Sequence, residues 1–135
     1  MNIIRPLLAT LLVFSIGCVA ASSAAAGRNY TKRLEKYELA IRWSEFDAAT
    51  KFEKPAGKDD AWSRAADEYR DIRVADYVVK DQKYQKDPKQ VLQTVEILYY
   101  KVNNPTIRSL IDRQRWEYDA DEKEWYLTTG LPAFQ

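Results

Sequence analysis

The stretch from Gln90 to Pro132 decides the fold of this chain of 135 residues, because it has the pattern of three consecutive antiparallel strands. These strands are VLQTVEILYYKV (Val91–Val102), TIRSLIDRQRWEYD (Thr106–Asp119) and EWYLTTGLP (Glu124–Pro132). β-Branched and aromatic residues dominate all three, and short polar turns separate them. The pattern predicts a meander that the rest of the chain covers on one face.

An amphipathic helix is predicted upstream, beginning near Asn29 or Thr31, because either side chain can cap a helix N-terminus. Its apolar residues recur every three or four positions, which is typical of one buried helical face. They are Tyr30, Leu34, Tyr37 and Ile41, with Leu39, Trp43 and Phe46 widening the stripe.

Two shorter helices are expected next. The first would be capped by Ser44 or Asp47, and the second would begin at Asp59 or Asp60 and continue through Tyr69.

A first strand is predicted over Ile72–Lys80, followed by a polar loop or frayed strand end over Asp81–Lys89. The apolar positions change parity around Asp76, which indicates a β-bulge there. The bulge would place four residues on one face: Ile72, Val74, Tyr77 and Val79. Helices followed by four strands predict an α+β fold with helices packed on one face of an antiparallel sheet.

Residues 1–26 have the composition of a targeting segment, which leaves residues 28–135 as a single α+β domain. Arg5 precedes an apolar run over residues 7–16, and small residues follow. The run is shorter than the roughly 20 residues of a transmembrane helix. A signal peptide, or a lipoprotein signal with a tether, is therefore predicted.

Charge and cysteine content restrict the possible partners of the domain and the ways in which it can be stabilised. Arg5 is the one charged residue among residues 1–17, so the 21 basic and 20 acidic residues of the chain become equal in number without this segment. A neutral domain argues against a nucleic-acid partner, which requires a basic face. The single cysteine, Cys18, lies in the targeting segment, so the domain has no internal disulfide.

Cys18 follows Gly17 at the end of the apolar run, which resembles the lipobox of bacterial lipoproteins. Ile16 and Gly17 fit that pattern, whereas Ser15 departs from it, since an aliphatic residue is usual there. The alternative is ordinary cleavage after Ala24 or Ala26, which also follow small residues. Acylation of Cys18 would anchor the chain at the outer membrane facing the periplasm, and cleavage in the alanine-rich stretch would release it into the periplasm.

The chain resembles the nuclear transport factor 2-like, or ketosteroid-isomerase-like, superfamily. The resemblance rests on the helical hairpin YELAIRWSEFDAATKF (residues 37–52), the run YRDIRVADYVV (residues 69–79) and the ending RWEYDADEKEWYLTTGLP (residues 115–132). Within that superfamily, the chain most resembles small exported proteins of Gram-negative bacteria. It implies a curved four-stranded sheet wrapped around the first helix as a cone. Isomerases, dehydratases and binding modules share this fold, so the fold selects no function.

The chemistry available in a cone cavity is limited. The chain has no histidine, which excludes Ser-His-Asp and Cys-His arrangements, and it carries no cluster of metal ligands and no glycine-rich phosphate loop. What remains is a strand carboxylate, Asp76 or Asp112. Isomerases of the superfamily use an Asp base with a Tyr and a protonated Asp.

A candidate pocket would be lined by five residues: Trp43, Asp76, Tyr99, Asp112 and Trp116. The competing interpretation is that the aromatic residues pack across strands and that both carboxylates are solvated or ion-paired. It leads to a non-enzymatic envelope protein with a binding or assembly role and no cofactor or metal. Its partner would be an unknown protein or small apolar ligand, and a homodimer stays open. The alternative is a small isomerase or dehydratase that uses a strand carboxylate.

Overall fold

The structure is a computed structural model that describes residues 19–55 and 66–135, with residues 19–28 described by their backbone alone. The helical part comprises α1 (Val19–Arg42), α2 (Phe46–Ala49) and the 3-10 turn η1 (Thr50–Phe52). The strands are β1 (Ile72–Lys86), β2 (Lys89–Lys101), β3 (Asn104–Asp119) and β4 (Glu124–Leu127). The predicted α+β class is confirmed.

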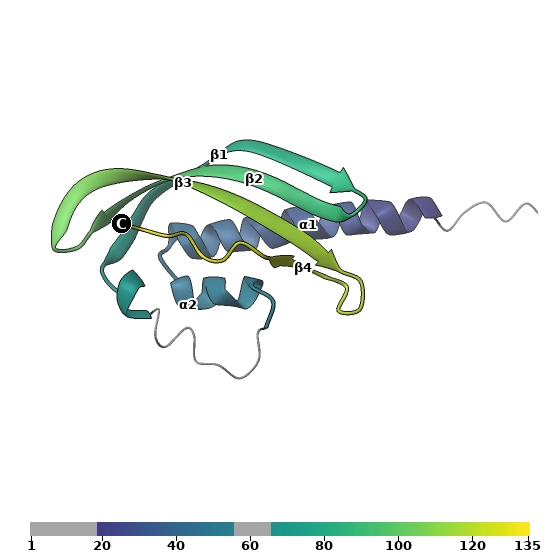
Figure 1. Cartoon of the computed structure of the whole chain (residues 1–135), viewed down its shortest axis with the longest axis horizontal. Helices are drawn as coiled ribbons and strands as arrows, with labels where there is room; N and C mark the ends of the chain where they lie inside the picture. Colours follow the sequence, from purple (N-terminus) through teal and green to yellow (C-terminus); the bar gives the residue numbers. More distant parts are fainter. Residues whose placement is uncertain (1–18, 56–65) are drawn as a thin grey trace, which may run out of the picture.

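The four strands form one antiparallel sheet in the order β1-β2-β3-β4, as the meander pattern predicts (Figure 1). The register places Ile97 between Tyr77 on β1 and Leu110 on β3, and it places Trp116 on β3 beside Leu127 on β4. Each strand pairs with its neighbour in sequence, so connections within the sheet are short.

Strand β1 is longer than predicted. Residues 81–86, expected as a loop or a frayed strand end, continue the strand and pair with residues 89–94 of β2. They belong to the edge strand, where most of their side chains are exposed, so their polar sequence carries no apolar alternation. The predicted bulge is confirmed by a register shift between Val74 and Asp76, and a second shift follows between Val79 and Asp81.

Strand β4 is shorter than predicted, since it ends at Leu127 rather than near Pro132. Beyond it, Thr128 N and Thr128 Oγ1 donate to Arg115 O, at 2.9 and 3.2 Å, and Arg115 N donates to Thr129 Oγ1 at 3.2 Å. Gly130 follows with φ 81°, a left-handed conformation that glycine adopts without a steric penalty.

Helix α1 begins at Val19, ten or more residues before the predicted start at Asn29 or Thr31. The stretch VAASSAAAG, which the sequence predicts to be a tether, is helical, because alanine has the highest helix propensity. Within residues 19–55 and 66–135, no helix has both the length and the apolar composition that crossing a membrane requires.

Helix α1 ends in a Schellman motif at Ser44. Glu45 N donates to Ala40 O at 2.8 Å, Ser44 N donates to Ile41 O at 2.9 Å, and Ser44 has φ 57°. The prediction that Ser44 or Asp47 is the N-cap of the next helix is wrong. Glu45 precedes α2 without a side-chain capping bond, and Asp47 lies inside α2. Most of the predicted third helix lies outside the described residues, but residues 66–69 are helical.

The core lies between α1 and the face of the sheet that covers it, which we call the inner face (Figure 1). Tyr37 and Ile41 of α1 are fully buried, and the ring of Tyr37 contacts that of Trp116 edge to face at 5.1 Å between centroids. From the sheet, the core receives Ile72, Tyr77, Val91, Val95, Ile97, Tyr99, Trp116, Trp125 and Leu127.

Two residues of the predicted helical stripe lie outside this core. Leu39 is 55% exposed and Trp43 is 72% exposed. At 3.6 residues per turn, each lies about 200° around the helix axis from the residue two positions away, so Leu39 faces away from Tyr37 and Ile41. The prediction that Leu39 and Trp43 widen the buried stripe is therefore wrong, whereas Phe46 is buried as expected.

Candidate functional site

The five residues of the candidate pocket fall into two groups. Tyr99, Asp112 and Trp116 lie on the inner face of the sheet, whereas Trp43 and Asp76 lie together where the end of α1 meets β1. One pocket containing all five is therefore wrong. The two groups have different surroundings and different chemistry.

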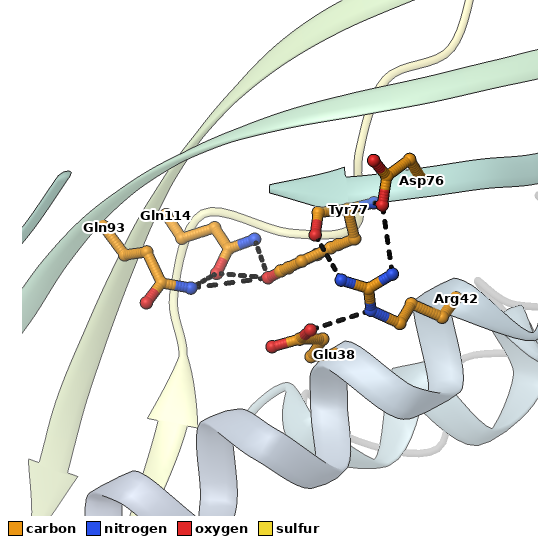
Figure 2. Close-up of polar contacts among 6 residues, drawn as sticks. All are labelled: Glu38, Arg42, Asp76, Tyr77, Gln93 and Gln114. Atoms are coloured by element: carbon orange, nitrogen blue, oxygen red, sulfur yellow. Dashed lines mark hydrogen bonds and ion pairs between the residues drawn. The ribbon is translucent and has the colours of Figure 1, made fainter. Parts of the chain in front are cut away.

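The inner-face group surrounds a network of hydrogen bonds that the sequence analysis missed. Gln114 Nε2 donates to Tyr77 Oη at 3.0 Å, Gln93 Nε2 donates to Gln114 Oε1 at 3.2 Å, and Trp116 Nε1 donates to the same oxygen at 3.1 Å. Figure 2 shows the two amides converging on the Tyr77 hydroxyl. Burial raises the pKa of Tyr77 far above its usual range, so its hydroxyl remains a neutral partner.

The signal for this network was present in the sequence. Gln93 shares the parity of Val91 and Val95 on β2, and Gln114 shares the parity of Trp116 on β3. A polar residue at an inward position must find partners, because an unpaired buried amide is costly. The register sets Gln93 directly opposite Gln114, which allows the hydrogen bond between the two amides.

Asp112 lies at the edge of this network. Its Oδ2 accepts a hydrogen bond from Gln114 Nε2 at 2.8 Å, and it forms no ion pair with another described residue. Burial raises the pKa of its carboxyl group, although the bond from Gln114 opposes this shift. Asp112 is therefore half-buried and without an ion pair among the described residues, so the expectation that it is solvated or ion-paired is not confirmed.

The Tyr37 hydroxyl is a second unusual group on this side of the sheet. It is buried and has no hydrogen-bond partner among the described residues. Its ring is held between Phe52 and Trp116, at 5.6 and 5.1 Å between centroids. Burial, together with the charge of Asp112, raises the pKa of Tyr37 well above its usual value. The phenol is therefore a neutral potential donor in an aromatic environment.

The second group begins with Arg42, which joins α1 to β1. Its guanidinium donates to Glu38 Oε1 at 2.8 Å, to Asp76 Oδ1 at 3.1 Å and to the backbone oxygen of Tyr77 at 2.5 Å (Figure 2). Asp76 is thus ion-paired, as one interpretation of the sequence predicted. Ser44 Oγ accepts a hydrogen bond from Val74 N at 2.9 Å, so both side chains bind the free edge of β1.

Trp43 lies between two hollows at this junction. One, of about 300 Å³, is lined by Leu39, Arg42, Trp43, Val74, Ala75 and Asp76. The other, of about 420 Å³, is lined by Trp43, Ser44, Phe46, Asp47, Ala66, Tyr69, Arg70 and Arg73. An exposed indole that lines two hollows of this size is available to contact a ligand or partner.

In comparisons with known proteins, no family model matches the chain, and no curated protein or solved structure matches it. Among the described residues, no three Asp, Glu, His or Cys side chains are grouped so that they could hold a metal ion.

Proposed function

We propose that this chain is a non-enzymatic protein of the bacterial cell envelope with a binding or assembly role. Cys18, at the end of an apolar run, supports export followed by lipid anchoring at the outer membrane, facing the periplasm. Cleavage in the alanine-rich stretch would instead give a soluble periplasmic protein. Membership in the cone-shaped superfamily is part of the proposal, and the curved sheet over α1 supports it (Figure 1).

The observation that carries this proposal is the exposure of Trp43. Tryptophan is highly buried on average, yet this indole is 72% exposed at the end of α1. The Schellman motif at Ser44 fixes the chain on both sides of it, so little entropy is lost when a partner binds. Aromatic anchors of this kind supply most of the energy of many interfaces.

The interior of the domain supports a role without catalysis. Tyr37, Trp116 and Trp125 have no exposed surface, and they occupy the space between α1 and the sheet. A substrate would need an open cavity beside Asp112, and that residue lines neither of the two hollows at Trp43.

The test is purification of the native chain from the cell envelope, followed by identification of the bound proteins and lipids by mass spectrometry. We expect Trp43→Ala to lose a bound component that the native chain retains. Ile107→Ala is the matched control, because Ile107 is a 54% exposed apolar residue outside both hollows. Equal recovery with both variants would contradict binding through Trp43.

A second candidate function is an isomerase or dehydratase, and the desolvated carboxyl group of Asp112 favours it. The assay is conversion of a β,γ-unsaturated ketone to its conjugated isomer, followed by ultraviolet absorbance. Turnover that disappears in Asp112→Asn would establish the enzyme and displace the proposal above. Equal background rates for the chain and the variant would remove this candidate.

A further inference from the structure

The surface around Trp43 carries a projecting side chain and a hollow next to each other. Trp43 projects from the end of α1, and the adjoining hollow of about 300 Å³ has an apolar wall formed by Leu39, Val74 and Ala75. A surface that has a projection and a matching recess is complementary to itself under a two-fold axis. A second copy can then insert its Trp43 into this recess while its own recess receives the first.

The charges around Trp43 are also complementary to themselves under a two-fold axis. Asp47 and Arg73 line the other hollow, both are exposed, and neither forms an ion pair with another described residue. Among the described residues, the Arg73 guanidinium donates to the backbone oxygens of Arg70 and Ile72, at 2.9 and 2.8 Å. One unpaired acid and one unpaired base on the same surface become two complementary pairs when two copies meet about a two-fold axis.

The base of the recess is rigid. Arg42 binds Glu38, Asp76 and the backbone of Tyr77, which ties the helix to the bulge of β1 (Figure 2). Ser44 Oγ accepts the hydrogen bond of Val74 N on the same wall. The recess therefore has its shape before a partner arrives, which lowers the entropic cost of association.

From this geometry we propose that the chain forms a two-fold homodimer in which Trp43 of each copy fills the recess of the other, with Asp47 of one facing Arg73 of its partner. The proposal rests on the proposed function, since it names the partner that the Trp43 surface receives. It gives the assembly role a specific form.

The first experiment is native mass spectrometry of the whole chain, purified from the envelope in detergent and measured over a range of protein concentrations. We expect two copies per particle. Trp43→Ala should raise the dissociation constant on the order of thirtyfold, the effect of removing an aromatic anchor. Ile107→Ala should leave it unchanged. Melting temperatures equal to that of the native chain would show that both variants fold.

The second experiment exchanges the charges. Asp47→Arg and Arg73→Asp should each weaken the dimer, because like charges would then face each other, and the double variant should restore it. A double variant as weak as the two single variants would overturn the pairing.

The outcomes separate this proposal from the proposed function. A dimer that is insensitive to Trp43→Ala overturns the arrangement in favour of another interface. A chain that stays single at every concentration, yet loses a bound envelope component in Trp43→Ala, overturns the second copy as partner and leaves the binding role intact. A single chain with no loss of a bound component overturns both.

Discussion

Asp112 gives the fold a pH dependence of predictable sign. Because burial raises its pKa in the folded protein, the folded state holds its proton more tightly than the unfolded state does. This contribution to stability is full below the ordinary pKa of Asp, near 3.8, and decreases as the pH rises through the higher folded pKa. Glu53, whose pKa burial also raises, acts in the same direction.

We therefore expect Asp112→Asn to be neutral or stabilising at pH 7 and to reduce the loss of stability between pH 4 and 7. Asparagine keeps an oxygen that can accept the hydrogen bond of Gln114. Urea denaturation of both chains across that pH range measures the difference. Because Glu96 and Asp119, whose pKa values are lowered, contribute with the opposite sign, only the difference between the two chains is informative. A larger loss of stability in the variant would contradict the assigned direction.

Ser44 has two structural roles, and two substitutions separate them. Ser44→Ala removes the acceptor of Val74 N while keeping the cost of a left-handed residue, so it should destabilise the fold by about 0.5–1.5 kcal/mol. Ser44→Gly removes the same acceptor but relieves the backbone, so it should cost less than Ser44→Ala. Chemical denaturation gives both values. Equal stability of the two variants would mean that the φ of 57° carries no cost.

At the scale of the elements, the two faces of the sheet can be compared by substituting one isoleucine on each face. Ile97 on β2 is fully buried, whereas Ile111 on β3 is 44% exposed on the opposite face. Ile97→Ala should cost about 2–5 kcal/mol, because it leaves a cavity under α1. Ile111→Ala should cost less than about 1 kcal/mol. Denaturation midpoints measure both, and similar losses would show that the outer face is also covered.

The sequence predicts the central strands better than the elements at the edges. The inward positions of β2 are strongly apolar, and alternation of this kind is visible without a structure. Most side chains of residues 81–86 are exposed and polar, so their sequence gives no apolar alternation to detect. The early start of α1 was missed because alanine-rich stretches suit a helix as well as a spacer.

The candidate site was only partly predictable, for reasons that lie in particular residues. Tyr99, Asp112 and Trp116 do share the inner face, as strand parity indicates. Trp43 does not join them, because helical geometry and the turn at Ser44 direct it outward. The left-handed residue that ends α1 is a serine rather than a glycine, so the end of the helix carried no recognisable signal.

At the scale of the whole molecule, processing at Cys18 gives a test of the envelope assignment. Intact mass of the native chain should show a mature protein that begins at an acylated Cys18. Cys18→Ser should leave the membrane fraction or remain unprocessed. A mature chain beginning at Ala25 or Gly27, without acyl groups, would exclude the anchor and favour the soluble periplasmic form.

Because α1 is continuous, its length sets the distance between Cys18 and Trp43. Its 24 residues at 1.5 Å each give a length of about 36 Å, from Val19, directly after Cys18, to Arg42, the residue before Trp43. If acyl chains hold Cys18 in a bilayer, the helix acts as a rigid spacer rather than a flexible linker. Trp43 then lies at the end of the spacer that is farther from the anchor. A helix that stands upright on the membrane would hold Trp43 about 36 Å from the lipid surface. Its partner would then be a molecule of the aqueous compartment or a second copy of the chain, and not the lipid.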